Sequence, residues 1–148
     1  MNINVKKINN KAHIPTRGSE FSAGSDLYAC LADGVEKINI NPGETVLIHT
    51  GLIIEIPFGY AGLIYARSGL ASKKGLAPAN KVGVVDADYR GEIMVAIHNH
   101  SNRMQSVSDG ERIAQLVITP FLTVDFNLVD ELTETERGAG GFGSTGKI

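Results

Sequence analysis

The sequence predicts one all-β domain, a sandwich or a barrel, with a single short helix and a mobile C-terminal arm. Short segments rich in β-branched residues follow one another through most of the 148 residues, as in sandwiches and barrels. Turn-forming pairs such as Pro42-Gly43 and Asp109-Gly110 separate these segments. A chain of about this length usually forms one domain, and no internal repeat or linker divides it.

Each predicted strand is a run of alternating or β-branched residues that ends at a turn. In chain order, we expect strands within residues 35–40, 44–56, 60–66, 81–85, 91–99, 112–121 and 124–132. The segment "SGLASKKG" (residues 68–75) predicts a helix of about two turns, with Ser68 as its cap and Gly75 at its end. We therefore expect a β domain over residues 1–136 and a flexible arm over residues 137–148.

The arm contains a pattern that is typical of phosphate binding. "GFGSTG" (residues 141–146) spells G-x-G-x-x-G, and with Lys147 it nearly spells a P-loop. Both motifs need a following helix, whose N-terminal N–H groups supply much of the anion binding. Only two residues follow Gly146, so we reject the Rossmann and P-loop interpretations.

Two interpretations of the arm remain. Its glycines allow close approach of backbone N–H groups to phosphate oxygens, and Arg137, Ser144 and Thr145 add side-chain donors. Phe142 could cover the flat ring of a ligand. Alternatively, the segment is a disordered polar tail with a biased composition.

Composition excludes several classes of protein. A net charge of −2 argues against duplex nucleic-acid binding, which needs many cationic contacts. No stretch approaches 18 apolar residues, so we expect no membrane span. The single cysteine, Cys30, excludes an intrachain disulfide and a zinc site built from cysteines. The N-terminal residues lack the pattern of a signal peptide, and we expect a cytoplasmic protein.

Two segments carry candidate functional residues beside predicted strands. Asp86 follows the apolar run "KVGVV" and opens "DADYRGE" (residues 86–92). A carboxylate at that position is either a hydrogen-bonded turn former or a general base. Arg67 and Ser68 lie where a predicted strand meets the helix. They form either an anion site or a simple serine cap.

Three further sets of residues are ambiguous. Asp26 lies among small residues, and is either a turn aspartate or a group that orders water around Mg²⁺. Arg112 and Gln115 are three residues apart, so they face opposite sides of a regular strand unless a bulge intervenes. His98 and His100 share one face of a strand, but without a third ligand at a suitable spacing we do not expect a metal site.

Five segments, taken together, resemble the five motifs of the trimeric dUTP pyrophosphatases (dUTPases). They are "AGSDLYA" (23–29), "ARSGL" (66–70), "GVVDADYRGE" (83–92), "RIAQL" (112–116) and "RGAGGFGSTG" (137–146). Each motif alone is weak, but five in this order in a short chain are specific. The resemblance runs from about Pro15 to Gly146. It implies a jelly-roll-like subunit, a homotrimer with active sites shared between subunits, and an arm that closes a neighbouring subunit's site.

The resemblance also implies an activity and a cofactor. These enzymes hydrolyse dUTP to dUMP and pyrophosphate with Mg²⁺, which lowers dUTP and supplies dUMP for thymidylate synthesis. Asp86 matches the catalytic aspartate, which would deprotonate a water that attacks the α-phosphorus. Tyr89 matches the aromatic residue that packs under the deoxyribose, and Asn80 matches an asparagine that contacts uracil. Asp26 matches an aspartate that touches Mg²⁺ through its bound water.

The other substrate-binding residues implied by the resemblance lie in or beside the same motifs. They are Arg67, Ser68, Gly69, Val84, Val85, Met94, Arg112, Gln115, Arg137, Phe142, Gly143, Ser144 and Thr145. Phe142 would stack on uracil, and the rest of the arm would meet the γ-phosphate. The departures are small: Val85 stands where the family more often has isoleucine, and Ser25 occupies a tolerant position.

Two rival functions fit the same fold less well. A dCTP deaminase needs a glutamate in the strand after the third motif, where this chain has Ala96. A nucleotide sensor without catalysis would keep the binding site and could lose the base, but Asp86 is present. The resemblance therefore favours the pyrophosphatase.

Overall fold

Turn residues divide residues 1–141, the part of the chain that the computed structural model describes, into short strands and one short helix. The predicted arm residues Phe142, Gly143, Ser144 and Thr145 lie outside the described residues. The elements are β1 (Asn4–Lys7), β2 (Thr16–Arg17), β3 (Gly24–Tyr28), β4 (Lys37–Ile40), β5 (Thr45–His49), β6 (Leu52–Glu55), β7 (Tyr60–Tyr65), α1 (Ser68–Lys74), β8 (Leu76–Pro78), β9 (Val82–Val85), β10 (Met94–Asn99), β11 (Gln105–Ser108) and β12 (Arg112–Pro120). The predicted all-β class is confirmed.

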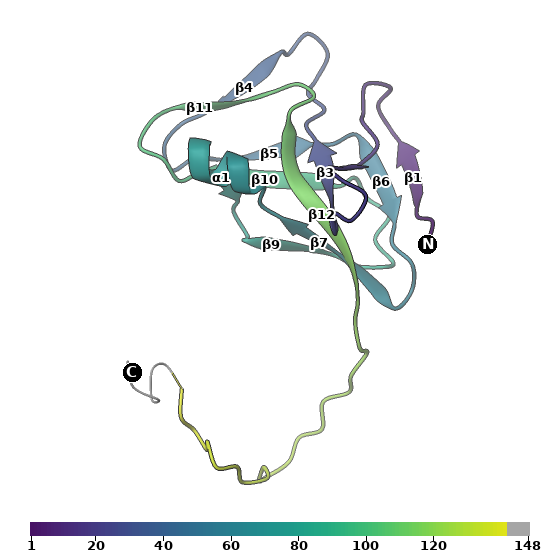
Figure 1. The fold of residues 1–148 in the computed structure, drawn as a ribbon, viewed down its shortest axis with the longest axis vertical. Coiled ribbons are helices and arrows are strands. Elements are labelled where there is room, and N and C mark those ends of the chain that lie inside the picture. The colour runs from purple at the N-terminus through teal and green to yellow at the C-terminus, as the bar shows by residue number, and fades with distance from the viewer. Residues whose placement is uncertain (142–148) are drawn as a thin grey trace.

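The strands of the described region pair antiparallel in four sheets (Figure 1). The largest has the order β2-β3-β12-β7-β9, and a second has the order β5-β10-β8. The pairs β1-β6 and β4-β11 complete the body. Apolar side chains from several sheets meet in one core, where Leu27, Ile48, Ile97 and Ile113 are fully buried. This burial is the main force that holds the sheets together.

The segment predicted as a single strand over residues 44–56 forms two strands, β5 and β6, which are separated at Gly51. Gly51 has φ 67°, a left-handed conformation that favours glycine. A Cβ there would lie 2.8 Å from the Cβ of Ala12 and 3.0 Å from the Sγ of Cys30. The residue therefore provides both the turn and the room for the core side chains beside it.

The predicted helix forms over Ser68–Lys74, but its predicted cap is wrong. Arg67 occupies the N-cap position with extended backbone angles, and no side chain caps the helix. Ser68 is the first helical residue, so its hydroxyl is not used in a cap. Gly75 ends the helix in a left-handed conformation with φ 68°, as predicted.

The strand predicted over residues 124–132 does not form. Residues 121–141 leave the body beyond β12 as an extended segment without helix or strand (Figure 1). A strand needs a partner for its backbone groups, and residues 124–132 of this segment find none within residues 1–141. Its apolar side chains are exposed, among them Phe126 at 94% and Leu128 at 102%. The domain boundary at residue 136 stays a prediction, and the last strand of the described region ends at Pro120.

Gly51→Ala should lower the free energy of unfolding by about 2–5 kcal/mol. Alanine at position 51 must keep the left-handed backbone conformation, which costs about 1–2 kcal/mol. Its methyl group also overpacks the core, which costs about 1–3 kcal/mol. Gly59→Ala is a matched control, because Gly59 has φ 81° but nothing within 4 Å of the added Cβ. Urea unfolding at a fixed protein concentration measures both. Equal losses in the two variants would contradict the packing at Gly51.

Candidate functional site

Most predicted site residues in the described region lie in two clefts. The first, here the Asp86 cleft, has a volume of about 250 Å³. It is lined by Leu47, Ile64, Asn80, Gly83, Val84, Val85, Asp86, Tyr89, Glu92, Ile93 and Met94. The second, here the Arg67 cleft, has a volume of about 470 Å³. It is lined by Gly18, Ser22, Ala23, Gly24, Asp26, Arg67, Ser68, Gly69, Arg112, Gln115 and Val117. Among the described residues, the two linings have none in common.

Strand β9 and the turn before it form one wall of the Asp86 cleft. Asn80 and Lys81 make this turn, where the N–H of Val82 donates to the carbonyl of Asn80 at 2.7 Å. Lys81 has φ 65°, an uncommon conformation for a residue with a side chain. Because β9 is an edge strand of its sheet, its outer backbone groups can bind a ligand directly. Asp86 follows directly after this strand and is exposed in the single chain.

The loop after Asp86 holds the ring of Tyr89 in place. The Tyr89 hydroxyl donates to the carbonyl oxygen of Glu92 at 3.0 Å. The ring covers Gly91, because a Cβ there would overlap the Tyr89 hydroxyl and lie 2.5 Å from its Cζ. Arg90 donates to the carbonyl of Ala87 at 2.7 Å and to its own neighbour's carbonyl, that of Tyr89, at 2.9 Å. The loop therefore presents Tyr89 and Asp86 in one defined arrangement.

Arg90 also ties this loop to the end of β6. Its NH2 group donates to the Oε1 of Glu55 at 3.2 Å, and the Asn4 side chain donates to Glu55 Oε2 at 2.7 Å. The Asn4 hydrogen bond, followed by the charge of Arg90, lowers the pKa of Glu55 from its ordinary value. Glu55 is therefore an anion that anchors the loop. Because these groups are exposed, the ion pair contributes little to stability.

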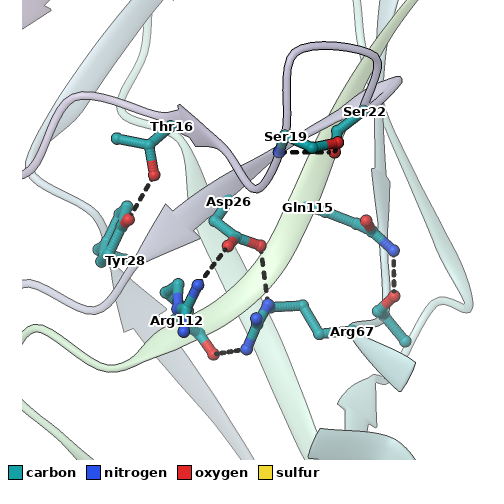
Figure 2. A network of polar contacts seen from close by, with 9 residues as sticks. Thr16, Ser19, Ser22, Asp26, Tyr28, Arg67, Arg112 and Gln115 are labelled. Atoms are coloured by element: carbon teal, nitrogen blue, oxygen red, sulfur yellow. Dashed lines mark hydrogen bonds and ion pairs between the residues drawn. The ribbon is translucent and has the colours of Figure 1, made fainter. Parts of the chain in front are cut away.

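Asp26 is the centre of the polar network in the Arg67 cleft (Figure 2). Its Oδ1 accepts from Arg67 Nε at 2.7 Å and its Oδ2 from Arg112 NH1 at 3.2 Å. Arg67 also donates to the carbonyl of Arg112 at 3.4 Å. The Asp26 side chain is 13% exposed and that of Arg67 is 27% exposed. Two guanidinium groups and one carboxylate leave a net positive charge, which favours an anionic ligand.

A bulge brings Arg112 and Gln115 into the same cleft. The register of β12 against β3 shifts between Arg112 and Ala114. Because the extra residue changes the alternation of side chains, both residues line the Arg67 cleft. Gln115 is paired with Asp26 in β3 and with Tyr65 in β7. Its Nε2 donates to the carbonyl of Ala66 at 2.9 Å (Figure 2).

Sequence reasoning missed several residues that line the clefts. A Cβ on Gly24 would lie 2.7 Å from Gln115 Oε1, so this glycine makes room for the glutamine. Its position inside the motif "AGSDLYA" was the sequence signal by which Gly24 could have been identified as part of the cleft. Glu92 lines the Asp86 cleft, although sequence reasoning gave it no role. Leu47, from a strand distant in sequence, has no local signal.

Other predicted positions lie elsewhere. Arg137 lines neither cleft within the described residues, and its Nε donates to the carbonyl of Gly140 at 2.8 Å. The rings of His98 and His100 are 4.4 Å apart. Burial, followed by the charges of His98 and Lys81, lowers the pKa of His100. No group of three or more potential metal-ligating side chains occurs in residues 1–141.

Two further findings concern the rest of the described chain. Cys30 is buried, and burial is the main cause that raises the pKa of its thiol. Cys30 therefore belongs to the hydrophobic core. In residues 1–141, the structure contains no helix with the length and apolar character that crossing a membrane requires.

Comparisons with known sequences give a consistent result. The dUTPase family model matches residues 10–146 of the chain. A deoxyuridine 5'-triphosphate nucleotidohydrolase of Nautilia profundicola is 49% identical over 147 residues, which cover 99% of this chain and 100% of that protein. One from Desulfitobacterium hafniense is 52% identical over 134 residues, which cover 90% of this chain and 87% of that protein.

Solved structures resemble the chain in fold as well. A mutant dUTPase of Staphylococcus bacteriophage 80alpha with dUpNHpp has a TM-score of 0.87 at 30% identity, covering 98% of each chain. A mutant dUTPase from phage phi11 of S. aureus, described with a structural Mg(II) ion, has a TM-score of 0.78 at 26% identity. It covers 88% of this chain and 98% of that one. The likeness confirms the predicted jelly-roll-like fold.

Asp26→Asn should lower the free energy of unfolding by about 1–2 kcal/mol, because it leaves the partly buried Arg67 without its anionic partner. The loss should shrink at high salt, which screens the charges. Asp33→Asn is the control: Asp33 pairs with Lys11 at 3.4 Å, but its side chain is 95% exposed, so the change should cost little. Urea unfolding at low and high salt measures both variants. Equal small losses would contradict a stabilising role for the Asp26 network.

Proposed function

Because the chain belongs to the dUTPase family, it is a dUTP diphosphatase, and we propose that its two clefts supply the two halves of each active site. The Asp86 cleft binds the nucleoside and holds the attacking water. The Arg67 cleft of a neighbouring subunit binds the phosphates. The observation that carries this proposal is the complete separation of the two linings among the described residues, although both contain family motifs.

Asp86 acts as the general base. Its ionised carboxylate orients a water molecule and accepts a proton as the water oxygen bonds the α-phosphorus. The bond between the α-phosphorus and the bridging oxygen breaks, and pyrophosphate leaves with the electron pair. One carboxylate is sufficient when its geometry is good. The exposure of Asp86 at the end of β9 supports this role, since the water and the substrate must both reach it.

The other residues of the Asp86 cleft select the nucleoside. Tyr89 packs under the deoxyribose and excludes a 2'-hydroxyl. Asn80 and the backbone of β9 hydrogen-bond uracil, beside Val84, Val85 and Met94, which also line this cleft. Within residues 1–141, β9 is the last strand of its sheet, and this edge position supports recognition through the backbone. Fixed donors and acceptors reject cytosine, because its exocyclic amine inverts one position of the pattern.

The Arg67 cleft neutralises the phosphates. Arg67 and Arg112 supply charge, while Ser68, Gly69 and Gln115 supply polar contacts to the triphosphate. Ser68 polarises the bridge toward the leaving pyrophosphate. The net positive charge of the Asp26 network supports this assignment, because substitution at phosphorus is accelerated chiefly by positioning and charge stabilisation.

Mg²⁺ fits this cleft as an ion carried by the substrate. The Asp26 oxygens already accept from two arginines, but a carboxylate oxygen has a further lone pair with which to hold a metal-bound water. No other acidic residue lines the described cleft, so the phosphates and water would supply the remaining ligands. When bound, Mg²⁺ would neutralise charge on the phosphates.

We propose that three copies of the chain assemble. Residues 121–132 support this, because Leu122, Val124, Phe126 and Leu128 alternate along an extended segment and are exposed in the single chain. Such a row of apolar residues is typical of a surface that another chain covers. The arm, with Arg137, Phe142, Gly143, Ser144 and Thr145, then closes over the nucleotide held by neighbouring subunits. We place this activity in the cytoplasm, where it lowers dUTP and supplies dUMP for thymidylate synthesis.

Asp86→Asn should abolish the release of pyrophosphate from dUTP and preserve nucleotide binding. The amide keeps the shape of the side chain but cannot accept the proton from water. A coupled pyrophosphate assay measures turnover, and calorimetry with a non-hydrolysable dUTP analogue measures binding. Asp88→Asn, two residues away and outside both clefts, is the matched control and should remain active.

The same assay separates the rival functions. The unmodified protein should release pyrophosphate from dUTP and not from dCTP or UTP. Ammonia from dCTP would instead favour a deaminase, and binding of dUTP without turnover would favour a sensor. Turnover by Asp86→Asn close to that of the unmodified protein would contradict the assignment of the base.

A chain that ends after Glu136 should lose most of its activity and stay trimeric. It lacks the arm that excludes water and completes the site, but it retains the apolar segment proposed to lie between subunits. A chain that ends after Pro120 should also lose the trimer. Light scattering of both truncated proteins, with turnover measured in parallel, checks this. If the chain that ends after Glu136 were monomeric, this result would contradict the role of the arm as a lid.

A further inference from the structure

Glu92 links the loop of the Asp86 cleft to the turn between β5 and β6. Its Oε1 accepts from the backbone N–H of Gly51 at 2.8 Å, and its Oε2 lies 2.8 Å from His49 Nδ1. The Glu92 side chain is only 17% exposed. A carboxylate at this depth costs free energy unless it is hydrogen-bonded, and here both oxygens have a partner.

The main chain of Glu92 holds the side chain of Tyr89. Its carbonyl oxygen accepts the hydrogen bond from the Tyr89 hydroxyl. Glu92 therefore contacts Tyr89 with its backbone carbonyl and the β5–β6 turn with its side-chain carboxylate. Gly91 lies under the Tyr89 ring without space for a Cβ, so the position of the ring depends on the backbone at residues 91–92.

The turn that receives the carboxylate is itself rigid. Thr50 is fully buried, and its hydroxyl donates to the carbonyl of Ile93 at 2.6 Å. The N–H of Ile93 donates to the carbonyl of Leu52 at 2.8 Å. The left-handed Gly51 is packed against Ala12 and Cys30. The Glu92 carboxylate is thus anchored to the core and not to a mobile loop.

We propose that Glu92 is a positioning residue that sets the selectivity of the enzyme for deoxyribose over ribose. Its carboxylate holds the backbone at residue 92, which in turn holds the Tyr89 ring against the sugar. The inference rests on the proposed function, in which Tyr89 excludes a 2'-hydroxyl. Releasing the carboxylate lets the ring move and opens space for that hydroxyl. Asp86 precedes the anchored part of the loop, so the chemical step is affected less.

The test is Glu92→Ala, measured with dUTP and UTP. The ratio of kcat/KM for dUTP to that for UTP should fall about tenfold, as expected when one fixed hydrogen bond that positions a group is lost. KM for dUTP should rise by a similar factor, while kcat stays within about threefold. Glu92→Gln should restore most of the selectivity, because its amide oxygen can still accept from Gly51.

Glu44→Ala is the matched control. Glu44 Oε2 accepts from the backbone N–H of Asn41 at 2.7 Å, so it also supports a turn, but Glu44 does not line the Asp86 cleft. This variant should keep the dUTP-to-UTP ratio of the unmodified protein. If Glu92→Ala keeps that ratio as well, Glu92 is only structural and the proposal is overturned.

A double mutant tests whether Glu92 acts on selectivity through Tyr89. The readout is the ratio of kcat/KM for dUTP to that for UTP, so a lower fraction of folded protein in a variant does not change it. Tyr89→Phe removes the hydroxyl that donates to Glu92 but keeps the ring and the carboxylate anchor. If both changes act on one ring position, Tyr89→Phe combined with Glu92→Ala should lose no more selectivity than Tyr89→Phe alone. A double mutant whose losses multiply would overturn the proposed coupling. Absence of dUTP turnover in the unmodified protein would instead contradict the proposed function itself.

Discussion

The pairing of β12 with β3 on one side and β7 on the other is the interaction on which the Arg67 cleft, the proposed phosphate half of the site, depends. Gln115 is paired with Asp26 and Tyr65 through these two ladders. Asp26 and Gln115 are far apart in sequence, and they can meet only because backbone hydrogen bonds hold the three strands in register. The bulge after Arg112 then changes the alternation of side chains along β12, so that Arg112 and Gln115 both line the Arg67 cleft.

The position of Asp26 between Arg67 and Arg112 has an electrostatic reason. Arginines that face an empty cleft would repel one another and lose hydration. Asp26 compensates them in the folded chain, while the Arg67 cleft keeps a net positive charge for a ligand with several negative charges. The Asp86 cleft, in contrast, is lined mostly by apolar residues and carries Asp86 at the end of strand β9. The two clefts are therefore suited to the two chemically different ends of a nucleotide.

The loop after Asp86 shows how a site is held by the core behind it. Arg90 ties one side of the loop to Glu55 and Glu92 ties the other to Gly51. The anchors differ in burial, and the exposed pair is worth less than the hydrogen bonds of the shielded carboxylate. These anchors are the basis of the proposal that Glu92 acts on selectivity through the position of Tyr89.

Local patterns were sufficient for much of the fold and for the family to which the chain belongs. The β-branched runs, the helix of residues 68–74 and its end at Gly75 depend on neighbours in the chain, and five motifs in order specify the family. The tertiary structure decided what depends on distant partners: the bulge at Arg112, the exclusion of Ser68 from the cap, and the anchoring of Glu92 by Gly51. It also decided that residues 124–132 find no partner strand among residues 1–141, because a strand is stable only when another strand satisfies its backbone groups.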